Sequence, residues 1–179
     1  MKALIGVGSN LDERSALMAE AVDHLRCLEG LGRASLSHLY ETRPWGRSDQ
    51  PDFLNAVASF DTEMEPTALL DECQGIERKM GRRSSGRWGP RRIDLDLLDI
   101  GGRIIGEDSL TLPHTGISRR AFVLIPVIEI APDWTDPISG KSAIELLAAL
   151  DPDPNEVRLF GRFPNRGEVN CQRPLIRPS

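Results

Sequence analysis

The chain has 179 residues and a mass of 19.8 kDa, a length that predicts one compact domain with an ordinary core. Its formal net charge of -5 gives no general attraction to nucleic acid or to an anionic membrane. No apolar run approaches the ~18 residues of a membrane span, and the apolar run at the N-terminus is too short for a secretion signal, so we expect a cytoplasmic protein.

The first part of the chain predicts strands and a helix in alternation. An apolar run over residues 3–8, ended by Gly8-Ser9-Asn10, indicates a buried strand followed by a turn. Leucine and alanine at helical spacing predict a helix that begins near Asp12 and stops before Gly30. Alternation over residues 36–41 predicts a second strand, and residues 53–60 predict a third.

The middle of the chain predicts a second helix, a loop and a hairpin. Pro66 fits a first helical turn, and apolar residues at helical spacing continue that helix to about Gly81. Residues 82–90 lack apolar periodicity and are expected to form a loop. Residues 92–100 predict a strand that turns at Gly101-Gly102 and returns over residues 103–105.

Two further helices are expected, one from Ser118 that Pro126 limits or kinks and one over residues 143–150. The order β-α-β-β-α-β, then a hairpin and two helices, is the ferredoxin-like order. It predicts an α+β fold with helices on one face of an antiparallel sheet. We expect one domain over residues 1–150 and, because residues 151–179 are rich in proline and lack periodicity, a C-terminal extended tail of open role, either packed across the domain or partly disordered.

The three cysteines lie far apart and form no CxxC pair. Cys27, Cys73 and Cys171 therefore indicate neither a disulfide framework nor a zinc site. We expect reduced thiols, as in a cytosolic protein.

Asp94 and Asp96 are two residues apart on a predicted strand, so both carboxylates should project from the same face. Asp99 should lie on the opposite face. A pair of carboxylates on one face suits Mg²⁺, which proteins usually hold by one or two carboxylates together with substrate phosphates. For this short motif alone, a solvent-facing strand with two ordinary acids is the more frequent explanation.

The loop before this strand concentrates positive charge. Five arginines fall within eleven residues: Arg82, Arg83, Arg87, Arg91 and Arg92. Such a run is often only solvated surface, yet beside a carboxylate pair it favours a polyphosphate ligand, because guanidinium groups grip phosphate oxygens while a metal bridges others. The chain has neither a GxxxxGK[ST] nor a GxGxxG motif, which excludes the two common phosphate-binding loops.

Further along the chain, His114 precedes Arg119 and Arg120 and could complete a second anion contact. A lone histidine is more often structural. Phe53, Asn55 and Phe122 could offer ring faces and an amide to a flat heterocycle, although as isolated residues they would be core by default.

Taken together, these motifs resemble the 6-hydroxymethyl-7,8-dihydropterin pyrophosphokinase family of folate biosynthesis. The resemblance runs from about Leu4 to Trp134, roughly three quarters of the chain, and several separate blocks in the same order make it specific. The blocks are GSN at 8–10, ETRPWG at 41–46, QPDFLN at 50–55, Gln74 with Glu77, GR at 81–82, RWGPRRIDLDLL at 87–98, PH at 113–114 and RAFVLIP at 120–126.

The resemblance implies transfer of the diphosphoryl group of ATP to the pterin hydroxymethyl oxygen, with release of AMP. It implies that Asp94 and Asp96 bind two Mg²⁺ ions and that Arg82 and Arg91 join them in catalysis. The ATP-binding residues would be Gln74, Glu77, Arg82, Arg87, Trp88, Arg91, His114 and Arg120. The pterin pocket would comprise Thr42, Arg43, Pro44, Trp45, Phe53, Asn55 and Phe122, with Phe53 and Phe122 on either side of the ring. The expected partners are these two small molecules, with no nucleic acid and no membrane, and the expected state is a monomer.

Two positions depart from the family pattern. Many members carry a second loop arginine where Ser84 stands here. Either Arg83 takes the place of that arginine or its contact is lost. Thr115 stands where some relatives have an aromatic residue, which puts one ATP contact in doubt.

Two other classes of protein remain as alternatives. A palm-type nucleotidyltransferase also places paired aspartates on a ferredoxin-like sheet, but it would need a template-binding surface, and this chain is short and acidic. An RNA-recognition module would stack bases on aromatic residues of the sheet, yet aromatics make up only 5% of the chain.

Overall fold

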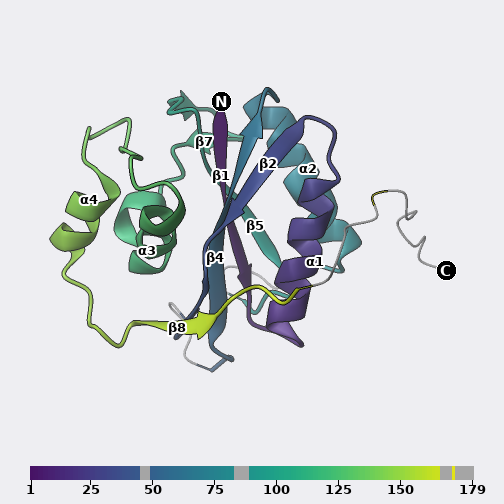
Figure 1. Ribbon diagram of the computed structural model, residues 1–179, viewed down its shortest axis with the longest axis horizontal. Coiled ribbons are helices and arrows are strands. Elements are labelled where there is room, and N and C mark those ends of the chain that lie inside the picture. The colour runs from purple at the N-terminus through teal and green to yellow at the C-terminus, as the bar shows by residue number, and fades with distance from the viewer. Residues whose placement is uncertain (45–48, 83–88, 166–170, 172–179) are drawn as a thin grey trace.

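The computed structural model describes residues 1–44, 49–82, 89–165 and 171. Three predicted site residues, Trp45, Arg87 and Trp88, lie outside the described residues, as do Arg83 and Ser84. Helices cover both faces of a central antiparallel sheet (Figure 1). None of the helices among the described residues is long and apolar enough to cross a membrane.

The elements follow one another in an order close to the predicted one. They are β1 (Lys2–Ser9), α1 (Arg14–Arg26), β2 (Leu31–Leu36), β3 (Leu39–Thr42), β4 (Phe53–Thr62), α2 (Pro66–Lys79), β5 (Asp94–Ile100), β6 (Ile105–Gly106), β7 (Thr111–Leu112), the 3-10 turn η1 (Ile117–Arg119), α3 (Ala121–Ile130), α4 (Ala143–Leu150) and β8 (Val157–Gly161). The sheet runs β5-β1-β4-β3-β8, with β2 also paired to β4. The predicted α+β, ferredoxin-like class is confirmed.

The strand predicted over residues 36–41 is divided between β2 and β3, and both pair with β4. Leu36 lies opposite Ala58 and Tyr40 opposite Asn55, so four steps on one side face three on the other. This extra residue is a bulge, and Ser37 stabilises it: its backbone N–H donates to the Val57 carbonyl, and its hydroxyl accepts from the Val57 N–H at 3.0 Å.

The prediction that the segment after Gly101-Gly102 pairs with β5 as a hairpin is wrong. Gly101 and Gly102 do turn the chain at positive φ, as glycine permits. The return segment then leaves the sheet, and Ile105–Gly106 pairs with Thr111–Leu112 instead. The outer edge of β5 is used by a later segment, since the His114 N–H donates to the Leu98 carbonyl at 2.8 Å. That contact brings His114 to the strand that carries the aspartates.

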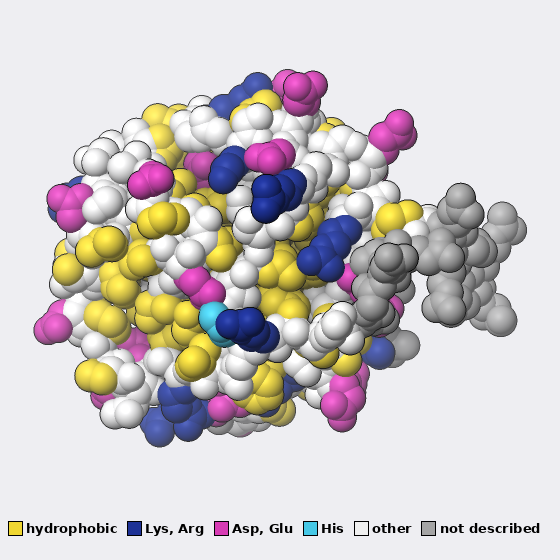
Figure 2. All heavy atoms as spheres, viewed as in Figure 1, with side chains coloured by type: hydrophobic (Ala, Val, Ile, Leu, Met, Phe, Trp, Pro, Cys, Tyr) yellow, Lys and Arg dark blue, Asp and Glu magenta, His cyan; other side chains and the backbone are white. Residues whose placement is uncertain are grey.

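The prediction of helices on one face alone is also wrong. The helices α1 and α2 pack on one face over a core that includes Phe60 and Leu95, whereas α3 and α4 cover the other over Leu4 and Leu98 (Figure 1). The helix α3, with the sequence AFVLIPVIEI, is apolar on nearly every side, so it needs a partner surface. Figure 2 shows hydrophobic side chains scattered over the surface of the α3–α4 side of the molecule.

Asp99 is not on the face opposite Asp94 and Asp96. The pairing register shifts where Leu4 and Ile5 meet β5, so the two-residue alternation is broken after Leu97. Asp99 is buried beside Trp134 and Asp136, on the side of the sheet that α3 covers. Burial raises the pKa of this carboxyl above its ordinary value.

Part of the segment after residue 150 joins the sheet, because β8 pairs antiparallel with β3. The expectation of three reduced thiols is corrected: a disulfide joins Cys27, just after α1, to Cys171. These residues are 144 positions apart, and their proximity depends on the path of the C-terminal segment, which residue spacing does not reveal. Cys73 is a buried free thiol in α2.

Candidate active site

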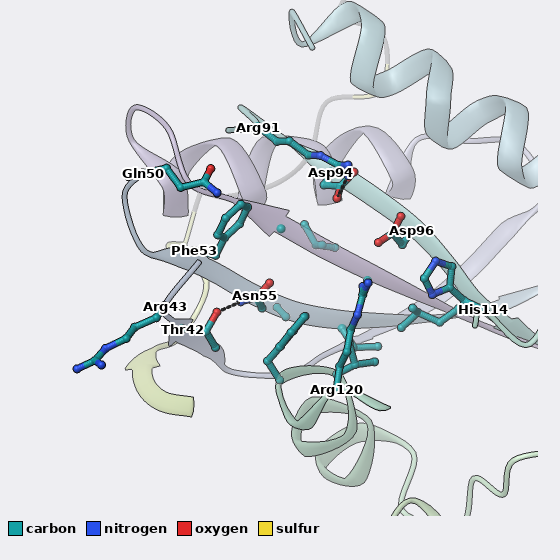
Figure 3. A pocket seen from close by; sticks show the side chains of 18 of the residues that line it. Thr42, Arg43, Gln50, Phe53, Asn55, Arg91, Asp94, Asp96, His114 and Arg120 are labelled. Atoms are coloured by element: carbon teal, nitrogen blue, oxygen red, sulfur yellow. Dashed lines mark hydrogen bonds and ion pairs between the residues drawn. The ribbon is translucent and has the colours of Figure 1, made fainter. Parts of the chain in front are cut away.

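A cavity of about 350 Å³ opens on the α3 side of the sheet (Figure 3). Its floor is β1, one wall is β4 with the end of β3, and the other wall is β5. The residues that line it are Gly6, Val7, Gly8, Thr42, Arg43, Gln50, Phe53, Asn55, Ala56, Val57, Gly89, Arg91, Asp94, Asp96, Leu98, His114, Arg120, Phe122 and Val123. Ten of the predicted site residues therefore meet in one cavity, although they come from segments spread over residues 42–122.

Asp94 and Asp96 project from β5 into the same cavity, as their spacing predicts (Figure 3). Arg91 pairs with one oxygen of Asp94, and Arg82 Nη1 lies 3.0 Å from the other, Oδ1. Burial and the negative charge of Asp94 raise the pKa of Asp96, while His114, Arg91 and Arg120 act to lower it. The site therefore holds two carboxylates: Asp94 is paired with arginines, whereas burial and the charge of Asp94 act against the charged form of Asp96.

Arg91 and Arg92 are neighbours with different surroundings. Although burial disfavours a charged guanidinium, Asp94, Asp96 and Glu77 hold the pKa of Arg91 above its usual range. The side chain of Arg92 is 48% exposed and points to Asp12 instead, with 3.6 Å between Nη1 and Oδ2. Only Arg91 of this pair lines the cavity.

Glu77 lies on α2, behind β5 rather than in the cavity. It is 4% exposed, accepts from the Leu95 N–H at 2.8 Å and pairs with Arg82. Gln74, one turn earlier on α2, is exposed and does not line the cavity either. The structure thus gives Glu77 contacts that hold Arg82 and the backbone between the two aspartates.

The protonation of Glu77 should be visible in the pH dependence of stability. Burial raises the pKa of Glu77 to about 7 from an ordinary value of 4.5, despite the opposing effects of Leu95 N–H and Arg82. The folded state then keeps a proton that the unfolded state loses, so the free energy of unfolding should fall as pH rises from about 4.5 to about 7. Glu77→Gln should remove this decline, measured by urea unfolding at pH 5 and pH 8.

Glu72→Gln, on the exposed side of the same helix, is the matched control and should unfold like the wild type at both pH values. A Glu77→Gln profile that parallels the wild-type profile would contradict the assignment of the titrating group.

The opposite end of the cavity carries aromatic and amide side chains. Phe53 and Asn55 come from β4, and the Asn55 Nδ2 donates to Thr42 Oγ1 at 2.8 Å (Figure 3). Phe122 comes from α3, with the guanidinium of Arg120 5.8 Å from its ring centre. A Cβ on Gly8 would lie 3.6 Å from Asn55 Oδ1, which places bare backbone at the floor of the cavity.

The other described residues predicted for the pterin pocket, Arg43 and Pro44, are peripheral to the cavity. Arg43 borders the cavity, but its guanidinium points away from it (Figure 3). Pro44 is not among the lining residues, and Trp45 lies outside the described residues.

His114 and Arg120 close the cavity beside Asp96 (Figure 3). The Gly116 N–H donates to His114 Nδ1 at 3.1 Å, so the proton of a neutral ring belongs on Nε2. The Arg120 guanidinium packs over Gly116, where an added Cβ would lie 2.8 Å from Cζ. These contacts fix the ring and the guanidinium as donors at the aspartate end.

Asn10 and Gln50, to which the sequence analysis assigned no role, also belong to this site. Asn10 is 1% exposed, and its Nδ2 donates to Gln50 Oε1 at 3.1 Å and to the Pro51 carbonyl at 3.2 Å. Its Oδ1 accepts from the Arg91 N–H at 2.7 Å. Asn10 therefore joins the loop before β4 to the backbone of Arg91. The available signal was the polar GSN turn directly after a buried strand.

Known proteins resemble this chain over most of its length. A family model described as 7,8-dihydro-6-hydroxymethylpterin-pyrophosphokinase (HPPK) matches residues 4–132. A Methylorubrum extorquens protein named 2-amino-4-hydroxy-6-hydroxymethyldihydropteridine pyrophosphokinase is 45% identical over 151 residues, which cover 84% of this chain and 94% of that protein. A Haemophilus influenzae protein of the same name is 42% identical over 137 residues, covering 76% and 86%.

Longer proteins match as well. The folic acid synthesis protein fol1 of Schizosaccharomyces pombe is 37% identical over 169 residues, covering 94% of this chain but 23% of that protein. A crystal structure of Plasmodium falciparum HPPK-DHPS superposes with a TM-score of 0.67 at 14% identity, covering 83% of this chain and 43% of that chain. The chain thus spans less than half the length of these longer proteins, and the solved structure supports the fold alone.

Proposed function

Because the chain belongs to the 7,8-dihydro-6-hydroxymethylpterin-pyrophosphokinase family, we propose that the cavity between β4 and β5 is its active site. The protein is a diphosphotransferase of folate biosynthesis. It transfers the diphosphoryl group of ATP to the hydroxymethyl oxygen of 6-hydroxymethyl-7,8-dihydropterin, which leaves AMP. One observation carries the assignment of the site: a single cavity has an aromatic, amide-bearing end and an end with two aspartates and two arginines.

We assign the aromatic end to the pterin. Phe53 and Phe122 present rings to a flat heterocycle, and such stacking adds to the gain from burial. Because Asn55 donates its Nδ2 to Thr42, its Oδ1 is oriented to accept from the pterin amino group. Arg43, Pro44 and Trp45 belong to the loop that borders this end and complete the proposed subsite.

We assign the opposite end to the phosphates of ATP. Arg91, Arg120 and His114 supply donors within the cavity, and Arg82 reaches Asp94 from its edge. Gln74, Arg87 and Trp88 complete the proposed ATP set, the last two outside the described residues. Glu77 serves this end indirectly, since its contacts are to Arg82 and to the Leu95 N–H.

The same end suits Mg²⁺. Asp94 and Asp96 offer carboxylate oxygens to one cavity, a donor set that fits this ion. Among the described residues, no group of three or more His, Cys, Asp or Glu side chains could hold a metal, so phosphate and water oxygens would complete the shell. We propose two ions, which would neutralise phosphate charge and assist ionisation of the acceptor hydroxyl.

The residues of the chain contribute mainly position and charge. Without nucleotide, Arg82 and Arg91 neutralise Asp94. With ATP bound, the guanidinium of Arg91 can move to phosphate oxygens, where it opposes the charge that develops during transfer. Phe53 and Phe122 fix the pterin so that its hydroxyl meets the phosphate, and holding two reactants in line removes much of the entropic barrier.

The test of the proposal is the identity of the nucleotide product. Purified protein with ATP, Mg²⁺ and 6-hydroxymethyl-7,8-dihydropterin should release AMP in a one-to-one ratio with the pterin diphosphate. ADP would indicate a simple kinase, and no turnover would leave only the fold. Activity that survives removal of divalent ions by a chelator would contradict the proposed metal role.

Filling the floor of the cavity should block the pterin. Gly8→Val should raise the pterin KM by about tenfold to a hundredfold, since each buried contact group that is lost or displaced is worth ~1–3 kcal/mol. The Cβ itself would meet only ordinary contacts of 3.6 Å and beyond, so the added methyl groups extend toward the cavity from a strand position without a clash at Cβ. Steady-state kinetics measure the pterin KM, and thermal unfolding of the variant shows whether the strand tolerates the change.

Gly106→Val is the matched control, since Gly106 is also in a strand and a Cβ there meets nothing within 4 Å. Equal pterin KM values for the Gly8 and Gly106 variants would exclude this cavity as the pterin subsite.

The setting of the enzyme is part of the proposal. We propose that residues 1–150 form the pyrophosphokinase domain, that residues 151–179 extend it, and that it works as a cytoplasmic monomer on small molecules without nucleic acid. The acidic net charge of -5 supports the exclusion of nucleic acid.

The Cys27–Cys171 disulfide is unusual for a reducing compartment. Light scattering tests the monomer, salt-dependent RNA binding tests the exclusion of nucleic acid, and thiol alkylation in intact cells tests the compartment.

A further inference from the structure

Two arginines connect the ends of the loop that borders the pterin subsite. Glu41 is next to the last residue of β3, and Asp52 directly precedes β4. Arg14, the first residue of α1, donates to Glu41 Oε1 at 3.0 Å and to the Asp52 carbonyl at 2.6 Å. Arg158, on β8, donates to Glu41 Oε2 at 3.1 Å and to Asp52 Oδ2 at 3.2 Å. Each arginine thus bridges the same two acidic residues.

The register of β8 explains how Arg158 reaches this position. Arg158 lies opposite Glu41 in the β3–β8 pair, and Val157 lies opposite Thr42. The strand β8 runs beside the end of the sheet where β3 and β4 meet the loop (Figure 1). It also lies beyond residues 4–132, the part of the chain that the family model matches.

The bridged residues adjoin two residues that line the cavity. Thr42 follows Glu41, Phe53 follows Asp52, and Thr42 and Phe53 are partners in the β3–β4 pair. Among the described residues, loss of Arg158 would leave the Asp52 carboxylate without an arginine partner and Glu41 with Arg14 alone, so negative charge would be in excess at the base of the loop.

We propose that Arg158 is a positioning residue for the pterin subsite: by joining Glu41 to Asp52 it holds Thr42 and Phe53 at the separation that the pterin requires. This inference rests on the proposed function of the cavity. It gives the C-terminal segment a role in the reaction through β8, although no atom of Arg158 lines the cavity.

The expected kinetic signature separates the two substrates. Arg158→Ala should raise the pterin KM by about three- to tenfold, because exposed ion pairs are individually weak but this residue makes two. The kcat should stay within about twofold and the ATP KM should rise by less than the pterin KM, because β5 holds the Asp94 end of the cavity and only Asn10 connects the loop to Arg91 among the described residues. Arg158→Lys should restore part of the pterin affinity, since an ammonium keeps the charge but lacks the planar fork.

A double-mutant cycle with Asp52 identifies the contact responsible. The carboxylate of Asp52 pairs with Arg158, whereas Arg14 binds its carbonyl. Asp52→Asn should therefore also raise the pterin KM. In the double variant, the fold-increase of the pterin KM should be smaller than the product of the two single increases.

Arg162→Ala is the matched control. Arg162 follows β8 and donates to His38 Nε2 at 3.3 Å, away from the loop, so its loss should leave the pterin KM unchanged. An equal rise in the Arg158 and Arg162 variants would mean that the tail merely stabilises the fold, which overturns the positioning role. An unchanged pterin KM in Arg158→Ala, or a matching rise in the ATP KM, overturns it as well.

A readout without turnover separates this inference from the proposed function. Backbone amide hydrogen exchange over residues 49–56 should speed up in Arg158→Ala and not in Arg162→Ala. A wild-type protein that forms no AMP would refute the proposed function before any variant is compared. Unchanged exchange in Arg158→Ala would refute the bridge even in an active enzyme.

Discussion

Asp96→Asn is expected to lower kcat by at least about a hundredfold to a thousandfold, the loss seen when one preorganised electrostatic contact to a transition state is removed. Asparagine keeps the volume of the side chain but cannot supply an anionic ligand to Mg²⁺. Stability should not fall, because asparagine keeps the volume of the side chain and removes a buried carboxylate whose charge burial and Asp94 disfavour. Steady-state AMP formation, Mg²⁺ titration and thermal unfolding measure the three quantities.

Asp99→Asn is the matched control on the same strand. Asp99 is buried and accepts from the Gly102 N–H, a contact that asparagine can keep, and it does not line the cavity. The Asp99 variant should retain wild-type kcat and Mg²⁺ dependence. Near-normal AMP formation by the Asp96 variant would exclude Asp96 as a metal ligand.

Arg91→Ala is expected to lower kcat by about 10²–10³-fold, again the scale of one lost transition-state contact, with a change in ATP affinity of less than about tenfold. Arg91 is the arginine that lines the cavity and pairs with Asp94 there. Its backbone N–H, which donates to Asn10 Oδ1, is unaffected by the substitution, so the local chain path should survive. Pre-steady-state turnover and equilibrium nucleotide binding distinguish the two effects.

Arg92→Ala supplies the comparison, since it removes an arginine one position away. Its ion pair with Asp12 joins side chains that are 48% and 60% exposed, and such pairs contribute ~1 kcal/mol or less to stability. The Arg92 variant should therefore turn over like the wild type. A loss of activity shared by both variants would indicate a general charge effect of the loop, not a contact made by Arg91.

Local patterns were sufficient for most of the fold. The helix over residues 143–150 was predicted at its observed bounds, and α1 and α2 follow from apolar spacing and from Pro66 at a first turn. The errors arose where distant segments compete for the same backbone. The break between β2 and β3 depends on the hydrogen bonds between Ser37 and Val57. The edge of β5 that the predicted return strand would occupy is instead bonded by the backbone N–H of His114.

The same distinction holds for the site. Alternation along a strand predicted that Asp94 and Asp96 share a face, because that geometry needs no information from elsewhere in the chain. It failed for Asp99, where a register shift against Leu4 and Ile5 changes the face. The contact of Asn10 with Gln50 spans 40 residues and two loops, so no local pattern could predict it.

Asn10 has a consequence for how the two substrates affect one another. The Nδ2 of its side chain donates to Gln50 and to the Pro51 carbonyl, while its Oδ1 accepts from the Arg91 N–H. A displacement of the loop before β4 therefore changes the geometry at Arg91, and the reverse is equally true. Thermodynamic linkage makes such an effect symmetric: whatever factor bound pterin imposes on the dissociation constant of the nucleotide, bound nucleotide must impose on that of the pterin.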